Sequence, residues 1–237
     1  MNGPRTAEET GRTAGDDLRR RLLAGAPVTE RRLDLAGVST AVLEGGDGPP
    51  VVLLHGQGGW AGVWVPVMAD LVRDHRVVAP DLPGLGASRV DGAAPTADRV
   101  LALVRHSLRP SERTAMGMLR QVSADVDRVK RRMGDRWDPF RAYSLELART
   151  PSVRRANRQL LRELGLRQLP PEEVARIDVP TTLIWGRQDR VMPLATAREA
   201  SVRYGWPLDV VDDAGHFLGV DQPEAFLGSL RRAFDRG

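Results

Sequence analysis

The stretch VVLLHGQGG at residues 51–59 decides how the rest of the chain is interpreted. Its first four residues are a continuous apolar run of strand length, which is typical of a strand covered on both faces in a parallel sheet. The His-Gly-x-Gly-Gly segment that follows ends the strand in a loop whose glycines let the backbone approach a ligand closely. Trp64, Met68 and Leu71 then recur at helical spacing, which predicts a helix over residues 61–73. A strand, a glycine loop and a helix in this order indicate an α/β fold.

Strand and helix patterns continue on both sides of this stretch. Upstream, the segments 32–35 and 38–43 predict a hairpin of two short strands, after a short helix at Asp16–Leu23. Downstream, residues 76–79 predict a second buried strand that runs into the loop APDLPGLGAS at residues 79–88. Near the C-terminus we expect strands at 181–185 and 208–211, a connecting helix at 195–204 and a final amphipathic helix at 223–234.

Length and composition favour a single globular domain. The chain has 237 residues, of which 41% are hydrophobic, and this is enough to bury one continuous core. Residues 1–15 are polar and are expected to be a flexible N-terminus, so the domain spans 16–237. Residues 96–164 read as helical and strongly charged, with Pro110 at the start of one helix.

Several function classes are disfavoured by composition. With no cysteine, disulfides and thiolate chemistry are excluded. The pI of about 10.4 accompanies a net charge of only +4, acidic residues are interleaved with the basic ones, and no nucleic-acid-binding motif is present, so we expect no nucleic-acid partner. No apolar run has the length of a signal peptide or membrane span. We therefore expect a cytoplasmic protein without a membrane partner, whose oligomeric state the sequence leaves open.

Metal and cofactor sites are not expected either. The four histidines at 55, 75, 106 and 216 lack metal-ligand spacing. Gly84-Leu85-Gly86 follows a strand but lacks the third glycine of a dinucleotide fingerprint, and there is no P-loop. The sequence therefore predicts no cofactor and no metal, and a small molecule as the substrate or ligand.

Four separated motifs together resemble the α/β-hydrolase family. They are VVLLHGQGG (51–59), APDLPGLGAS (79–88), TTLIWGRQDRVMP (181–193) and DDAGHFLGVDQPEAF (212–226), each at the carboxyl end of an expected strand. Ligand sites of open α/β sheets lie at those strand ends. The resemblance implies a mostly parallel, doubly wound sheet with an N-terminal hairpin and a helical cap, here inserted at about 96–170.

The same resemblance implies a set of site residues. His216 matches the family's general-base histidine and Asp189 its triad acid, which fixes the imidazole tautomer. The backbone N–H of Gln57 matches the oxyanion donor, aimed at charge that appears only in the transition state. The surrounding loop residues expected at the substrate are His55, Gly56, Gly58 and Phe217. The structural alternatives are an ordinary tight turn for the glycine loop and a turn-forming or salt-bridged role for Asp189.

The nucleophile does not match the family pattern. A nucleophile elbow needs small residues around its serine because the turn is strained and crowded, and no such string lies between the second and third motifs. The nearest candidate is Ser107, but arginines at 105 and 109 occupy the positions that need small residues. The alternative for Ser107 is a serine on a helix surface, whereas Ser88 is expected to order its own loop.

Spacing points to a missing segment. Only 101 positions separate Ser88 from Asp189, and the charged helical stretch fills most of them. A strand–helix–strand unit needs roughly 30 residues or more, so the elbow strand, its helix and the next strand do not fit. We therefore expect an internal deletion that leaves the sheet without its central strand or strands.

Three functions are compatible with this pattern. The first is a hydrolase of ester, amide or related acyl bonds that uses the site residues above. The second is a catalytically inactive homologue, either a small-molecule binder or a decayed copy. In the third, His216 activates water directly on an activated substrate.

Overall fold

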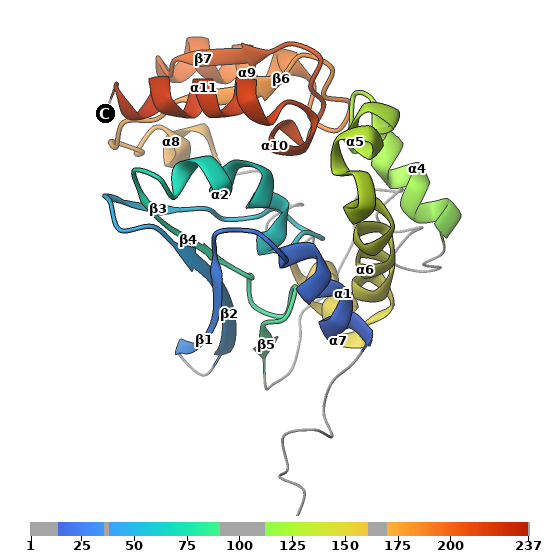
Figure 1. Ribbon diagram of the computed structural model, residues 1–237. Helices are drawn as coiled ribbons and strands as arrows, with labels where there is room; N and C mark the ends of the chain where they lie inside the picture. Colours follow the sequence, from blue (N-terminus) through green and yellow to red (C-terminus); the bar gives the residue numbers. More distant parts are fainter. Residues whose placement is uncertain (1–13, 36–37, 91–111, 161–169, 237) are drawn as a thin grey trace, which may run out of the picture.

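The chain forms a larger mixed sheet in its N-terminal half and a smaller sheet near its C-terminus (Figure 1). The structure is a computed structural model that describes residues 14–35, 38–90, 112–160 and 170–236. The strands of the larger sheet are β1 (Thr29–Leu35), β2 (Val38–Gly45), β3 (Pro50–Val52), β4 (Arg76–Pro80) and β5 (Arg89–Val90). Their order is β1-β2-β4-β3, and β5 pairs with β2.

The N-terminal hairpin forms as the sequence predicts. β1 and β2 pair antiparallel from Thr29 opposite Glu44 to Leu35 opposite Val38. β4 pairs antiparallel with β2 and parallel with β3, with Val52 opposite Val78. Because β3 and β4 are parallel, the loops that follow them emerge at the same edge of the sheet, and the glycine loop starts there.

The smaller sheet holds the C-terminal motifs. Its strands β6 (Leu183–Gly186) and β7 (Leu208–Val211) pair in parallel, with Gly186 opposite Val211. Within the described part of the chain, no strand joins β6 to β3. In the described residues, β3 therefore pairs only with β4 and β6 only with β7, so each has one unpaired edge. The sheet is split between β3 and β6, where the sheet implied by the resemblance would continue.

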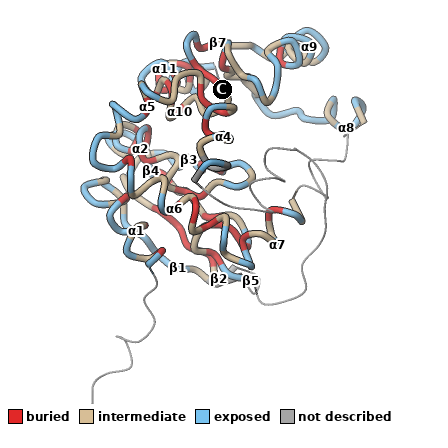
Figure 2. Tube along the Cα trace, turned by 90° about the vertical axis from the view of Figure 1, so that its right-hand side faces the viewer, coloured by how far each residue is buried: buried red, intermediate tan, exposed pale blue. Residues whose placement is uncertain are grey.

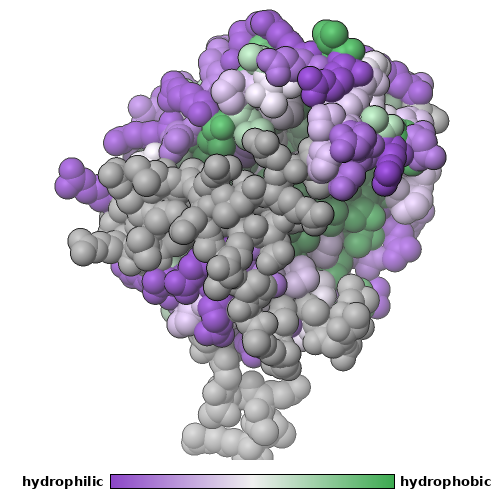
Figure 3. Space-filling model, turned by 180° about the vertical axis from the view of Figure 1, so that it is seen from behind, coloured by the Kyte–Doolittle hydropathy of each residue, from purple (hydrophilic) through white to green (hydrophobic). Residues whose placement is uncertain are grey.

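Two exposed side chains mark the same interruption. Val52 and Leu54 are each 60% exposed, and residues two apart in an extended strand point to the same face. A helix packed on that face would bury both of them. Apolar surface is indeed open on the back of the molecule (Figure 3). The expected α/β class is found, but the sheet of the described residues is mixed rather than mostly parallel: β3–β4 and β6–β7 pair in parallel, whereas β2 pairs antiparallel with β1, β4 and β5.

The main core lies between the larger sheet and two helices. The short 3-10 helix η1 (Ala61–Trp64) leads into α2 (Val65–Leu71), and α11 (Pro223–Phe234) packs beside α2. Met68 and Leu71 are fully buried, and each contributes about 1.5–3 kcal/mol of hydrophobic stabilisation. Ile184 of β6 packs against this cluster. The small sheet therefore contacts the main core through side chains rather than strand pairing, and buried segments run through the interior of the molecule in Figure 2.

A layer of helices, which we name the cap, stands beside the strand ends. Its elements are α4 (Glu112–Val122), α5 (Val126–Met133), η2 (Gly134–Arg136), α6 (Trp137–Arg149) and α7 (Pro151–Leu160). α5 begins where the Asp125 carboxylate accepts the N–H of Arg128 at 2.9 Å, which satisfies one free donor of the first turn. The N-terminal helix α1 (Ala14–Leu23) packs against α6 (Figure 1).

The remaining elements agree with the sequence in part. The helices expected at 195–204 and 223–234 are α9 (Leu194–Tyr204) and α11, whereas the short elements β5, α8 (Pro171–Val174) and α10 (Leu218–Asp221) were not predicted. Residues 91–111 and 161–169 lie outside the described residues. None of the described helices is long and apolar enough to cross a membrane.

Candidate active site

His216 and Asp189 meet at the carboxyl ends of β6 and β7. Asp189 follows β6 and His216 follows β7, so parallel pairing brings the two loops together. The His216 Nδ1 lies 3.0 Å from Asp189 Oδ2. The other oxygen, Asp189 Oδ1, accepts the N–H groups of Val191 and Met192 at 2.8 Å each. The carboxylate is thus fixed by its own loop and offers one oxygen to the imidazole.

Gly186 allows this close approach. A Cβ at this position would lie 2.2 Å from the carbonyl oxygen of Gly215 and 2.5 Å from that of Ala214. Only a glycine therefore lets the end of β6 pack against the backbone that carries His216. The sequence motif Trp-Gly-Arg-Gln-Asp supplies this glycine three residues before the acid.

The second imidazole nitrogen is open to chemistry. The hydrogen bond from Nδ1–H to Asp189 leaves Nε2 as the unprotonated nitrogen of a neutral ring. The His216 side chain is 37% exposed, whereas that of Asp189 is 4% exposed. Nε2 has no hydrogen-bond partner among the described residues. An oriented imidazole with one free nitrogen can accept a proton from a nucleophile.

The glycine loop is tied to its surroundings by His55. This side chain is buried, its Nε2 accepts the N–H of Leu82 at 2.9 Å, and its Nδ1 lies 2.8 Å from the carbonyl oxygen of Gly56. Burial lowers the pKa of His55 below its usual value. Because both ring nitrogens contact backbone, His55 joins the loops after β3 and β4, and in this arrangement neither nitrogen is available to a substrate.

The cap helix α7 holds the same loop through Asn157. Asn157 Oδ1 accepts the N–H of Gly58 at 2.9 Å, and its carbonyl oxygen accepts the Gln57 side-chain amide at 2.6 Å. Asn157 is itself buried. The Gln57 backbone N–H, by contrast, makes no hydrogen bond to another described residue.

A small cavity lies between this loop and the cap. It encloses about 50 Å³, and its walls include Gly58, Trp60, Phe140, Arg154 and Phe217. Phe217 adjoins His216, so the cavity reaches the loop that carries this histidine. Two of the lining residues, Trp60 and Arg154, each carry a buried donor, Nε1 and Nε respectively, without a hydrogen-bond partner among the described residues. A site with apolar walls and unpaired donors is suited to an apolar molecule that carries acceptor oxygens.

The structure describes one of the two serines considered as candidates from the sequence. Ser107 lies outside the described residues. Ser88 is buried, donates to the carbonyl oxygen of Asp81 at 2.8 Å and accepts the N–H of Ala41 at 2.9 Å, so it orders its loop. No described serine is hydrogen-bonded to His216. Within the described residues, no group of three His, Cys, Asp or Glu side chains could hold a metal.

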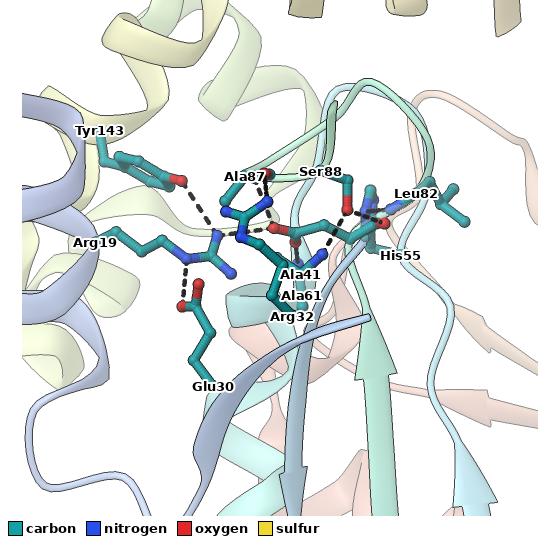
Figure 4. A network of polar contacts seen from close by, with 11 residues as sticks. Arg19, Glu30, Arg32, Ala41, His55, Ala61, Leu82, Ala87, Ser88 and Tyr143 are labelled. Carbon is teal, nitrogen blue, oxygen red and sulfur yellow. Dashed lines mark hydrogen bonds and ion pairs between the residues drawn. The ribbon is translucent and has the colours of Figure 1, made fainter. Parts of the chain in front are cut away.

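A buried charge network beneath the loops was not predicted from the sequence. Arg19 of α1 lies 2.9 Å from Asp81 Oδ2 and 2.7 Å from Glu30 Oε2, and it contacts the hydroxyl of Tyr143 in α6 at 3.2 Å (Figure 4). The Arg19 guanidinium also lies 4.6 Å from the ring centre of Trp60. The network thus links the N-terminal helix, the loop after β4 and the cap.

The arrangement is that of a hydrolase-type site on an α/β sheet. It combines an acid and a histidine on loops at the strand ends with a glycine loop and a layer of helices. A sequence profile of the alpha/beta hydrolase fold family matches residues 49–169, about half of the chain. The chain belongs to this family.

The most informative relative is a 2-hydroxy-6-oxo-6-(2'-aminophenyl)hexa-2,4-dienoic acid hydrolase from Metapseudomonas resinovorans. It is 27% identical over 269 aligned positions, which cover 84% of this chain and 89% of the relative. The structure also resembles 2-hydroxy-6-oxo-6-phenylhexa-2,4-dienoate hydrolase of Rhodococcus sp. strain RHA1, with a TM-score of 0.73 and 20% identity over 88% of this chain and 99% of that chain. A serine hydrolase of carbazole degradation gives a TM-score of 0.70 at 22% identity, over 88% of this chain and 99% of that one.

The alignment to the Metapseudomonas enzyme leaves many positions without a residue in this chain. Since 84% of 237 residues is about 199, about 70 of the 269 aligned positions have no residue in this chain. A strand–helix–strand unit needs roughly 30 residues or more. The unmatched positions, summed over all gaps of the alignment, exceed that length.

Proposed function

We propose that this protein hydrolyses an acyl-type bond in a small molecule, with His216 as the general base and Asp189 as the residue that orients it. The observation that carries the proposal is the 3.0 Å contact between His216 Nδ1 and a buried Asp189 carboxylate. An imidazole held in this way has its free nitrogen directed away from the acid. Proton transfer to such a base contributes about 10²–10⁴-fold to a reaction rate.

The reaction follows from these positions. His216 Nε2 removes a proton from the attacking oxygen, which is either the Ser107 hydroxyl or a water molecule. The attack converts the substrate carbonyl to an oxyanion, and the Gln57 N–H donates to that oxygen. When the intermediate collapses, the imidazolium returns its proton to the leaving group. If Ser107 attacks, a second cycle with water releases the acyl group.

We propose a small oxo acid or a related carboxylate as the substrate class. The Metapseudomonas relative is named for a 6-oxo dienoic acid, which combines an apolar body with a ketone and a carboxylate. The cavity that Phe217 lines, next to His216 in sequence, has mainly apolar walls, and two of its lining residues, Trp60 and Arg154, carry buried unpaired donors. Helices α4 to α7 would serve as the cap that selects this substrate, within one domain that spans 16–237.

A fluorophosphonate probe tests the serine route. We expect wild-type protein to gain one adduct by intact mass and the Ser107→Ala variant to gain none. If neither form is labelled but the wild type hydrolyses a 4-nitrophenyl ester, water is the nucleophile. If neither is labelled and no ester or oxo acid is turned over, the hydrolase proposal is wrong.

The split sheet favours a second candidate, a small-molecule binder without turnover. In the described residues no strand lies between β3 and β6, where a nucleophile elbow would stand. A binder would give the same thermal stabilisation by an oxo acid in wild-type protein and in His216→Ala, with no turnover in either. An Arg154→Met variant, which removes a donor of the cavity, would abolish that stabilisation.

A further inference from the structure

Asp221, at the end of α10, is a buried carboxylate that the hydrolase reaction does not use. It is fully buried; Arg132 donates to its backbone carbonyl oxygen at 2.7 Å, but no side-chain cation among the described residues pairs with its carboxylate. Its oxygens instead accept three hydrogen bonds, from the Ser123 hydroxyl, from the N–H of Ala124 at 2.9 Å and from the N–H of Gly215 at 2.7 Å. The donors come from two places, the junction between α4 and α5 and the loop that carries His216.

The junction and the histidine loop also touch directly. The N–H of Phe217 donates to the carbonyl oxygen of Val122 at 3.1 Å. A Cβ on Gly215 would lie 2.7 Å from that same oxygen, so only glycine allows the two backbones to pack this closely. Both neighbours of His216 are therefore bonded to the α4–α5 junction, one through Asp221 and one directly.

We propose that Asp221 is a positioning residue that holds His216 against Asp189 and makes this position depend on the cap. A buried carboxylate is costly unless its oxygens are hydrogen-bonded. Asp221 is therefore most stable when Ala124 and Gly215 both donate to it, which requires the junction and the histidine loop to be in place together. Hydrogen bonds to a charged acceptor are also stronger than neutral ones.

The coupling gives the cap a route to the catalytic loop. Helix α4 ends at the junction and supplies Met118 and Leu119 to the wall of the cavity. A molecule that fills the cavity contacts α4 and can shift the C-terminal end of this helix. Asp221, which is hydrogen-bonded to the α4–α5 junction, then passes this shift to Gly215 and His216. The link to catalysis rests on the proposed function, whereas the position of His216 is measurable without turnover.

Ring-nitrogen NMR tests the proposal. A long-range ¹H–¹⁵N spectrum at a pH of about 8.5, where histidines are neutral, shows which nitrogen of His216 carries the proton. We expect a single Nδ1–H tautomer in wild-type protein and a mixture of tautomers in Asp221→Asn, because an amide cannot accept from all three donors. The matched control is Asp212→Asn, an exposed carboxylate near the same loop, which should keep the wild-type tautomer. An unchanged Nδ1–H tautomer in folded Asp221→Asn overturns the proposal.

Amide exchange provides a test that does not require the Asp221 variant to fold. In Ser123→Ala, which loses one donor to Asp221, the Ala124 and Gly215 amides should both exchange faster, by a similar factor. Acceleration of Ala124 alone contradicts the coupling. Because neither readout involves turnover, a protein that shows the coupling but hydrolyses nothing would refute the proposed function and leave this inference intact.

Discussion

Replacing Arg19 with methionine tests the buried network that joins α1, the β4 loop and the cap. Arg19 is 3% exposed and Asp81 is fully buried. Asp81 also accepts the N–H groups of Ala61 at 2.6 Å and Ala87 at 2.7 Å, so it cannot move toward water without breaking the loop. In the Arg19→Met variant, the Asp81 carboxylate stays buried but loses its ion pair with Arg19.

The expected cost is large. Removing one partner of a buried ion pair destabilises a protein by about 3–5 kcal/mol, out of a typical total of about 5–15 kcal/mol. Burial alone disfavours the charged Arg19, yet Asp81 and the neighbouring Tyr143 and Glu30 raise its pKa above the usual value. The guanidinium therefore remains charged, and replacing Arg19 removes a full positive charge from beside the Asp81 carboxylate.

Urea denaturation followed by circular dichroism measures the effect. The control is Arg20→Met, because Arg20 is exposed and its one ion pair within the described residues is with Asp17, one turn earlier. A surface pair of this kind contributes about 0–1 kcal/mol. We expect Asp81→Asn to recover part of the stability in the Arg19→Met background. A loss below about 1 kcal/mol in Arg19→Met would refute the reasoning, since it would equal that of a surface pair.

Three further predictions concern the loops and the split sheet. Burial lowers the pKa of His55, so the unfolded chain binds more protons than the folded protein as the pH falls below about 6.5, and the free energy of unfolding should decrease there. Urea titrations at several pH values measure this dependence, and the slope of the unfolding free energy against pH should be smaller in His55→Asn. An unchanged slope would contradict an origin in His55. Gly186→Ala places a Cβ 2.2 Å from the Gly215 carbonyl oxygen and should cost more than about 1 kcal/mol, whereas Gly117→Ala, with open space around it, should stabilise or leave the protein unchanged in thermal melts. Leu54→Ser, at a side chain that is 60% exposed, should change stability by less than about 0.5 kcal/mol and reduce aggregation in light scattering; a loss of several kcal/mol would mean that a neighbour covers this face.

Sequence patterns predicted the elements that depend on local chemistry. The apolar runs at β3, β4, β6 and β7, and the helical spacing of Trp64 and Met68, are local signals, and the elements lie where they predict with bounds shifted by one or two residues. The strand at β3 is not covered on both faces as expected, since Val52 and Leu54 are each 60% exposed. His216 and Asp189 were assigned from the resemblance of their motifs to those of the family, and the parallel pairing of β6 and β7 brings the two loops together.

Contacts between distant residues could not be predicted in this way. Arg19 meets Asp81 and Tyr143 across 62 and 124 positions of the chain, and no periodicity marks a helix-surface arginine as buried. The role of Asn157 at Gly58 likewise depends on how α7 packs over the glycine loop. His55 was expected at the substrate, but the sequence could not show that Leu82 and Gly56 occupy its nitrogens.

The most direct test of the account is the rate of ester or oxo acid hydrolysis by the wild type, by His216→Ala and by Asp189→Asn. The account predicts that wild-type protein turns over substrate and that His216→Ala loses at least about 100-fold in kcat/KM, as expected for removal of a general base. Asp189→Asn should lose activity as well, because the imidazole then lacks its orienting acceptor. Equal rates in all three proteins would contradict the assignment of His216 and Asp189 as the working pair.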